Sequence, residues 1–511
     1  MKREFLIFVI LAYVLFSDAQ DYPVDMYYTL SRSYAGWKAK SNVHIVKISH
    51  HTFISGVNPN SPTIEENFCL YEEGSNEPHE IKTKFDGAMV CDYKKVEDVW
   101  NHYIIGSVFN MIQKKGFQTP LRNELEDDAI DFINKLQNDG RAFKDPYLEN
   151  YIYSLVARIA PVTLIDGRPG NVNIVILDDA VQNVFTFSNG TIVVTTGLLA
   201  ALHTEDELVA ILAHEIAHFV LDHSIANVNA DAKRQKRAEF WASVATGVAA
   251  VAEGVAAMKN PYYKPGNGTL AVAMISSSIA ESYLKRQGMA YNHEQESEAD
   301  KVAWELLRFL GYDQNALATA LSRLWKTYND ERSNAVYYAS YTHPALIERI
   351  TNMGKPNEKC DPQYEKMVSF AVSSAAMKKY ANRRYRQTLS LVNQNIKNNV
   401  GTVSDYILRA SCMLALKNDQ DSNQEALNSI SKAKSLRPND LNLYKPESIA
   451  LLRLNKRDEA INILKQYQTS IKQEYENLKQ IGNDAEWSLQ NNYLNSEYSW
   501  AANMLIKLNG M

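Results

Sequence analysis

The sequence lacks several features that would place it in a specialised class of protein. Its 511 residues contain only four cysteines, no long basic tract and no low-complexity segment. A formal net charge of −5 at pH 7 argues against nucleic acid as a general partner. With 45% hydrophobic and 22% charged residues, the chain is expected to be globular, with two or three domains.

The few cysteines do not predict a metal site. None has the Cys-x-x-Cys spacing of a structural zinc site, so they are expected to be disulfides or inert thiols. Four cysteines allow three pairings, and the sequence does not choose among them. Pairing of Cys69 with Cys91 would stay within the N-terminal region, and the other two are Cys360 and Cys412.

The apolar run at the N-terminus is too short to predict a transmembrane span. Lys2-Arg3 precede this run, from Phe5 to Phe16, and Ser17-Asp18-Ala19 then gives a small-x-small pattern. The arrangement predicts a signal peptide over residues 1–19 and an exported protein, which in a bacterium would reach the periplasm. No cysteine follows the run, which excludes a bacterial lipoprotein anchor.

Histidine is scarce too, yet two of the eleven stand in His214-Glu215-Ile216-Ala217-His218. Residues four apart share one face of a helix, so both imidazoles can reach one metal ion with Glu215 beside it. Two imidazoles and one further ligand hold zinc with an open position. The adjacent carboxylate can move a proton from water to a leaving amine. The alternative is a pair of partly exposed histidines on an amphipathic helix.

The flanking residues predict that this segment is helical. Thr204 and Glu207 have the spacing of a capping box. Apolar residues then recur at helical spacing and are expected to bury one side of the helix: Leu208, Ile211, Leu212, Ile216 and Val220.

A second helical segment downstream offers a third ligand. Glu296 and Asp300 are four apart and project from one side of this helix. The spacing suits Glu296 as a ligand and Asp300 as an acceptor that orients a ligand histidine. Without the histidine motif, the same acidic residues would indicate only a solvated helix start.

In combination these motifs resemble the HtpX/BepA-type gluzincin metallopeptidases, the family that also contains the CAAX prenyl proteases. The resemblance implies one zinc ion per chain on His214, His218 and Glu296, with Glu215 as general base and Asp300 behind a ligand histidine. Four blocks carry it, over roughly residues 145–355: Asn183-Val184-Phe185 with Ser188 to Leu199, the HExxH helix, Glu296 to Asp300, and Thr342-His343-Pro344 with Arg349-Ile350. One departure is Val184, where many relatives carry alanine.

Two further residues take their expected roles from the resemblance. It places His343 near the zinc, either as a donor to the tetrahedral oxyanion or in the open coordination position as a brake. Arg349 is expected to fix the same region through carboxylate or carbonyl contacts. His223, His293 and the His50-His51 pair are not expected among the zinc ligands.

Residues 191–195 follow a Ser-Asn-Gly turn and are rich in β-branched residues, which predicts a strand. By resemblance to zinc peptidases, this is expected to be an edge strand that pairs with an extended peptide. An ordinary core strand is an equal alternative. The residues concerned are Thr191, Ile192, Val193 and Val194.

The rest of the chain divides into three regions. Residues 20–110 are expected to form a small β-rich domain or an extension around the peptidase, which occupies residues 111–357. Within it, residues 240–284 predict a helical hairpin. Glu253 and Glu281 argue against a membrane crossing, so the hairpin is expected to pack on the protein or touch a membrane surface.

Residues 360–511 are expected to be helical throughout. Ala426-Leu427, Ala433 and the stretch 436–440, with its Pro-Asn-Asp break, have the spacing of tetratricopeptide repeats. Such repeats offer a concave surface to protein partners. The alternative is a plain helical bundle packed against the peptidase.

The sequence thus predicts an α+β fold, with a mainly helical zincin-type peptidase domain and small sheet followed by an all-α tetratricopeptide-like domain. The expected activity is that of an exported zinc metalloendopeptidase with polypeptide substrates. The resemblance implies quality control of unfolded or misassembled envelope proteins. The alternatives are a chaperone or scaffold with a latent protease site, and a membrane-associated CAAX-type peptidase.

Overall fold

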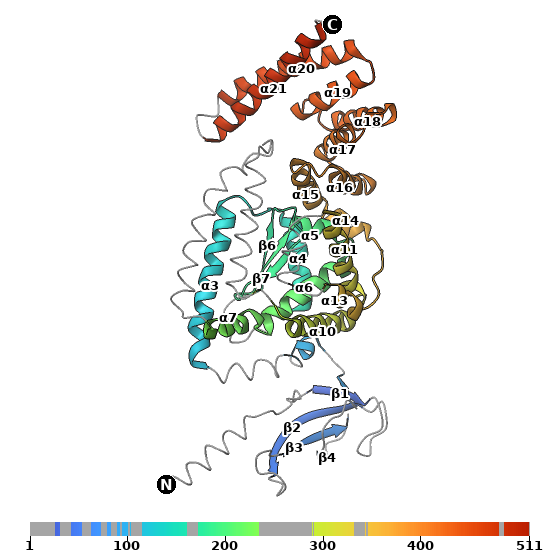
Figure 1. Ribbon diagram of the computed structural model, residues 1–511. Helices are drawn as coiled ribbons and strands as arrows, with labels where there is room; N and C mark the ends of the chain where they lie inside the picture. The colour runs from blue at the N-terminus through green and yellow to red at the C-terminus, as the bar shows by residue number, and fades with distance from the viewer. Residues whose placement is uncertain are drawn as a thin grey trace.

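The structure is a computed structural model of the chain (Figure 1). Among the helices it describes, none is long and apolar enough to cross a membrane. The expected signal peptide (1–19) and the expected hairpin (240–284) lie outside the described residues. Those are 26–30, 42–53, 63–72, 79–82, 89–91, 95–100, 103, 115–160, 172–234, 289, 291–331, 343, 346–479 and 485–509.

Five strands form an antiparallel sheet in the N-terminal region, in the order β4-β3-β2-β1-β5. The sheet lies within residues 20–110, and the extent and role of that region stay a prediction. Cys69 lies on β3 and Cys91 on β5, and two strands, each about 4.8 Å from the next, separate them. Their pairing would need the sheet to fold back on itself and stays an expectation. The strands are β1 (Met26–Leu30), β2 (Asn42–Phe53), β3 (Thr63–Glu72), β4 (His79–Lys82) and β5 (Met89–Cys91).

The central region is mainly helical and contains a three-stranded sheet. Its helices before residue 235 are α3 (Lys115–Asn138), α4 (Pro146–Ile159), α5 (Thr196–Ala201), α6 (Glu205–Val220) and α7 (His223–Arg234). The later ones are α10 (His293–Leu310), α11 (Ala316–Glu331) and α13 (Leu346–Met353). The strands are β6 (Asn173–Leu177), β7 (Val184–Thr186) and β8 (Thr191–Thr195).

The order of the small sheet is β6-β8-β7, which overturns one prediction. Strand β8 pairs in parallel with β6 on one side and antiparallel with β7 on the other. All five of its residues are buried, because helices and strands cover it on every side. The prediction that Thr191, Ile192, Val193 and Val194 form an edge strand is therefore wrong. Within the described residues, β7 lies next to the HExxH helix and pairs with β8 alone.

Helix α6 carries the HExxH motif and lies at the centre of the main core (Figure 1). Its N-cap is Thr204, whose hydroxyl accepts from the Glu207 N–H at 3.2 Å. The reciprocal bond of a capping box is absent here, since the Glu207 carboxylate accepts instead from the His203 N–H at 3.0 Å. Residues 207–220 are all buried, not only one side as expected, because α4, α10, α11 and β7 surround the helix.

The C-terminal region is a succession of helices in which neighbours in sequence pack on one another. They are α14 (Pro362–Met367), α15 (Ser369–Ala381), α16 (Tyr385–Lys397), α17 (Val403–Leu416), α18 (Gln420–Leu436), α19 (Tyr444–Arg453), α20 (Arg457–Lys479) and α21 (Ala485–Asn509), with a 3-10 turn at Leu441–Leu443. The predicted fold class, a mainly helical peptidase-like domain with a small sheet followed by helices, is confirmed.

The first helices of this region share the core of the central region. Tyr364, Val368 and Val372 are fully buried in the same apolar cluster as Leu198 and Leu199 of α5. The Tyr364 hydroxyl also donates to the Leu199 carbonyl at 3.1 Å. The core therefore continues past the boundary expected near residue 357.

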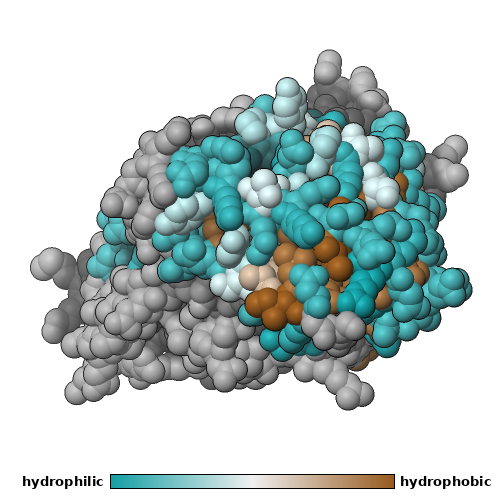
Figure 2. All heavy atoms as spheres, turned by 90° about the horizontal axis from the view of Figure 1, so that it is seen from above, coloured by the Kyte–Doolittle hydropathy of each residue, from teal (hydrophilic) through white to brown (hydrophobic). Residues whose placement is uncertain are grey.

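Seen from above, most of the described surface is hydrophilic, with an area where hydrophobic residues gather (Figure 2).

Candidate metal centre

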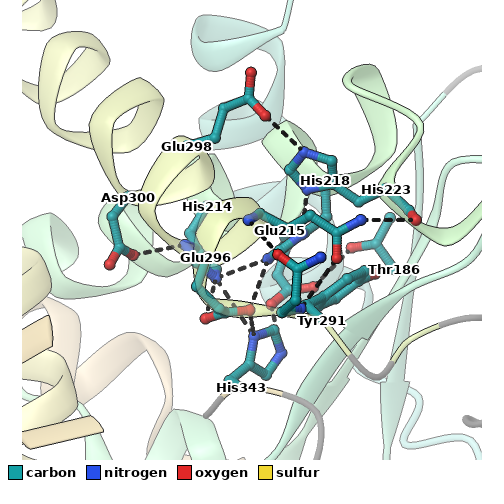
Figure 3. Close-up of polar contacts among 12 residues, drawn as sticks. Thr186, His214, Glu215, His218, His223, Tyr291, Glu296, Glu298, Asp300 and His343 are labelled. Atoms are coloured by element: carbon teal, nitrogen blue, oxygen red, sulfur yellow. Dashed lines mark hydrogen bonds and ion pairs between the residues drawn. The ribbon is translucent and has the colours of Figure 1, made fainter. Parts of the chain in front are cut away.

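Helix α6 turns its two motif histidines toward each other inside the protein (Figure 3). His214 and His218 are one helical turn apart, and their Nε2 atoms lie 3.0 Å from each other. Both side chains are buried, so neither belongs to an exposed amphipathic face. This excludes the alternative of two surface histidines.

Helix α10 brings a carboxylate, that of Glu296, to this pair of histidines. The N-cap of α10 is Asn292, whose side chain forms a complete capping box with Gln295. Glu296 therefore lies in the first turn of the helix. Helix α10 packs against α6, which places the Glu296 carboxylate 3.3 Å from His218 Nε2 and 3.6 Å from His214 Nε2. Two imidazoles and a carboxylate thus converge from two helices.

One ligand histidine is oriented by a carboxylate and an arginine. His214 Nδ1 lies 3.0 Å from an Asp300 oxygen, one turn beyond Glu296 on α10. Arg349 of α13 donates two bonds to the Asp300 carboxylate, at 2.8 and 2.7 Å, and also pairs with Glu296. This arginine holds the carboxylates of Glu296 and Asp300 in place.

The other ligand histidine is supported by a chain of two groups. His218 Nδ1 lies 2.8 Å from His223 Nδ1, and His223 Nε2 lies 3.1 Å from the Glu298 carboxylate. If His223 donates to Glu298, it accepts from His218, which leaves the Nε2 lone pair of His218 for a metal. The Tyr291 ring stacks on His218, with centroids 3.6 Å apart.

Glu215, the carboxylate of the HExxH motif, accepts a hydrogen bond through only one of its oxygens among the described residues. Thr186, at the end of β7, donates its hydroxyl to Glu215 Oε2 at 3.1 Å. Among the described residues, Glu215 Oε1 has no hydrogen-bond partner, and His343 Nε2 lies 3.4 Å from it. Glu215 is therefore positioned by one oxygen and has the other available as a base.

His343 lies on the open side of the cluster, between Glu215 and the zinc-ligand set. Its Nδ1 is 3.0 Å from a Glu296 oxygen and 3.4 Å from His214 Nε2. His214, His218, Glu296 and His343 each offer one donor atom within 4.8 Å of the others. Its imidazole thus occupies the side from which a water or a peptide carbonyl would approach.

The cluster fits a zinc ion. The inward Nε2 lone pairs of His214 and His218 face each other, which is repulsive unless a cation lies between them. Glu296 Oε2 is buried there and contacts Arg349 Nη1, while Oε1 of the same carboxylate lies 3.3 Å from His218 Nε2. Tetrahedral ligands about 2.1 Å from zinc lie about 3.4 Å apart. The separations are 3.0 Å between the two Nε2 atoms, 3.3 Å from His218 to Glu296 Oε1 and 3.6 Å from His214 to Glu296 Oε2.

The charges in the site set the protonation that a metal needs. Burial by itself raises the pKa of Glu296, but His343 and Arg349 outweigh it and hold the pKa well below its ordinary value. Burial lowers the pKa of His218 well below its ordinary value, so the imidazole is neutral. Burial opposes protonation of His343 too, but the carboxylates of Glu296 and Glu215 raise its pKa. An ionised carboxylate and a neutral imidazole are the forms that bind zinc.

The other histidines considered from the sequence lie away from the cluster, and three residues not considered as part of the site contact its members. His293 is exposed and lies 3.9 Å from Glu348, so it does not compete with Glu296. His50 and His51 lie on β2. Sequence reasoning gave no role to Thr186, Tyr291 or Glu298. Glu298 belongs to the Glu296–Asp300 motif, and Thr186 directly follows Asn183-Val184-Phe185, so both could have been found from the family motifs. No sequence signal marks Tyr291.

Known proteins match the part of the chain that holds this site. Residues 146–357 match the model of peptidase family M48. The putative beta-barrel assembly-enhancing protease of Vibrio cholerae serotype O1 is 27% identical over 238 residues, which is 43% of this chain and 41% of that protein. The beta-barrel assembly-enhancing protease of Escherichia coli K12 is 26% identical over 194 residues, covering 38% and 36%.

A shorter relative matches the same region. Metalloprotease LoiP of Escherichia coli K12 is 27% identical over 189 residues, 37% of this chain and 63% of that protein. The similarity thus spans less than two thirds of each of these relatives.

Proposed function

Since residues 146–357 are a peptidase family M48 domain, we propose that this chain is a zinc-dependent endopeptidase. The observation that carries the proposal is the convergence of His214, His218 and Glu296 at separations of 3.0 to 3.6 Å. Glu215, with one unpaired oxygen within the described residues, lies beside them. Two histidines, a glutamate and an adjacent carboxylate are the donor set of hydrolytic zinc sites.

The chain's own residues supply the proton transfers. Zinc, when bound by the three ligands, supplies a Lewis acid that polarises the peptide carbonyl and acidifies the attacking water. Glu215 Oε1 accepts the proton of that water while Thr186 holds the other oxygen. A C–O bond forms at the carbonyl carbon and the C–N bond breaks. The protonated Glu215 then gives its proton to the departing nitrogen.

An extended substrate would pair with β7 and not with β8. The Asn183 carbonyl accepts from the Thr195 N–H, and the Phe187 N–H donates to the Thr191 carbonyl of β8. The alternate residues Val184 and Thr186 therefore direct their backbone groups to the other edge. No strand in the described part of the chain pairs with that edge. The Thr186 side chain contacts Glu215, so a peptide on this edge would pass beside the general base.

We assign His343 the role of a brake. Its side chain is only 12% exposed and lies within 3.4 Å of Glu296, His214 and Glu215. A substrate carbonyl and this imidazole would compete for one space. Movement of the His343 side chain out of this space would then open the site to a peptide.

The setting of the activity rests on the relatives and on the N-terminal pattern. Two relatives are named for enhancing beta-barrel assembly, which concerns envelope proteins. Together with the expected signal peptide, this supports an exported peptidase, in the periplasm of a bacterium, that handles unfolded or misassembled envelope proteins. The C-terminal helices would bind protein partners as a tetratricopeptide-like array. Their consecutive packing supports this assignment.

Casein cleavage by the purified chain tests the proposed chemistry. Glu215→Gln should lose activity by about 10²-fold or more while retaining zinc, because it removes the base and keeps the three ligands. His214→Ala and Glu296→Ala should lose zinc as well. Equal cleavage by the parent chain and Glu215→Gln would instead favour a scaffold or chaperone whose metal site is not used in catalysis.

A further inference from the structure

A second cluster of potential metal ligands lies outside the site described above, where the central region meets the C-terminal helices. We propose that His203, Cys360 and Glu365 form a second zinc-binding site at this junction. An imidazole nitrogen, a thiol sulfur and a carboxylate oxygen from these residues lie within 4.8 Å of one another. Cys360 and Glu365 are five residues apart, and only the fold brings His203 to them from 157 positions before Cys360.

Two of the three side chains already touch. His203 Nδ1 lies 2.7 Å from a Glu365 oxygen. The backbone of His203 is fixed just before α6, because its N–H donates to Glu207 at 3.0 Å. The second oxygen of Glu365, on α14, accepts from the Asn398 side chain at 2.5 Å. The imidazole and the carboxylate are therefore oriented before any metal binds.

The backbone on both sides of Cys360 is anchored to the central region. Arg323 donates to the Lys359 carbonyl at 2.7 Å, and the Asp361 N–H donates to the His203 carbonyl at 2.8 Å. The Cys360 thiol is free and exposed, so a metal ion can reach it from solvent. Cys412 provides a contrast in exposure, since it is fully buried in α17.

The chemistry of the three donors selects the kind of metal. Thiolate and imidazole are soft or borderline ligands that favour zinc over magnesium or calcium. One thiolate and one carboxylate also neutralise a divalent cation, and the exposed side leaves the fourth tetrahedral position to water. A metal here would link the turn between α5 and α6 to α14, and so brace the junction between the two regions.

Cobalt(II) titration of the reduced, metal-free full-length chain distinguishes this site from the first. Cobalt replaces zinc in such sites, and a thiolate ligand adds a sulfur-to-cobalt charge-transfer band in the near ultraviolet. The first site contains no sulfur ligand, so the band would report the second site alone. We expect two cobalt ions per chain and this band.

Three variants complete the test. Cys360→Ser should lose the band and one of the two ions while cleaving casein like the parent chain, and Cys412→Ser should keep both. His214→Ala should lose the other ion and keep the band, so failure of the proposed peptidase site would not be mistaken for failure of this one. A single ion without the band, or a band that survives Cys360→Ser, would overturn the proposal.

Discussion

At the scale of single residues, the two histidines proposed to bind zinc are supported differently. His214 contacts a carboxylate directly, through Asp300, which Arg349 holds with two bonds. His218 contacts a second imidazole, His223, and only through it the Glu298 carboxylate. The orientation of His218 therefore depends on a side chain that a substitution can remove without adding or removing a proposed zinc ligand.

Removing this support should weaken zinc binding without removing a ligand. We expect His223→Ala to lower zinc affinity by about 10- to 100-fold, because His218 loses the partner that fixes its ring and tautomer. Competition with a chromophoric chelator measures the affinity. His293→Ala, which removes an exposed histidine on α10, is the matched control and should bind zinc like the parent chain. Unchanged affinity in His223→Ala would show that the contact does not orient His218.

A second prediction at this scale separates the two roles open to His343. As a brake, its removal frees the side on which substrate enters, so His343→Ala should cleave casein faster than the parent chain at equal zinc content. If His343 donated to the oxyanion instead, the same variant would lose about 10²- to 10³-fold in kcat. Initial rates measured alongside Glu215→Gln, which stays inactive under either role, decide between them.

At the scale of elements, strand order decides where substrate can bind. A buried, β-branched strand and an edge strand can have the same sequence pattern, and β8 is the former. The neighbouring β7 is only three residues long, yet its outer edge is unpaired among the described strands. Backbone pairing to β7 would recognise main-chain groups at alternate positions of a substrate.

Peptides with modified backbones can test whether alternate residues of a substrate form hydrogen bonds to β7. A series of cleavage-resistant peptide inhibitors, each with one backbone N-methyl group, should lose affinity at the positions that face β7, by about 5- to 10-fold per lost hydrogen bond. Peptides methylated at the positions between them are the controls and should bind almost normally. Inhibition constants give the profile, and a profile without alternation would argue against strand pairing.

At the scale of the whole molecule, the central region and the C-terminal helices are not independent. The family match ends at residue 357, but Tyr364, Val368 and Val372 complete the core around α5. Each such buried side chain contributes about 1.5–3 kcal/mol, against a total stability of about 5–15 kcal/mol for a typical domain. Loss of all three would remove a large part of that stability.

Truncation tests this shared core. A chain ending at residue 357 should aggregate or melt well below the full chain, because it exposes the apolar surface that α14 and α15 cover. A chain ending at Lys417, after α17, should keep zinc and casein cleavage. Thermal unfolding and metal content are the measurements. Full stability of the shorter chain would place the domain boundary at 357 after all.

The sequence by itself determined the features that depend on local spacing. Histidines four apart on one helix must share a face, and so must Glu296 and Asp300 one turn apart on another. Asp300 behind His214 and Arg349 against the carboxylates followed from the family resemblance, and the structure places them there. The same local rules gave the Thr204 cap and the helical C-terminal region.

Only the tertiary structure decided the features that depend on which distant segments meet. Strand order made β8 central and β7 the edge, because hydrogen-bond pairing joins strands irrespective of their own sequence pattern. Packing of four elements buried α6 on all sides, although its periodicity indicated one apolar face. Long-range folding likewise put His343 over the zinc ligands and Cys360 beside His203, 157 positions earlier in the chain.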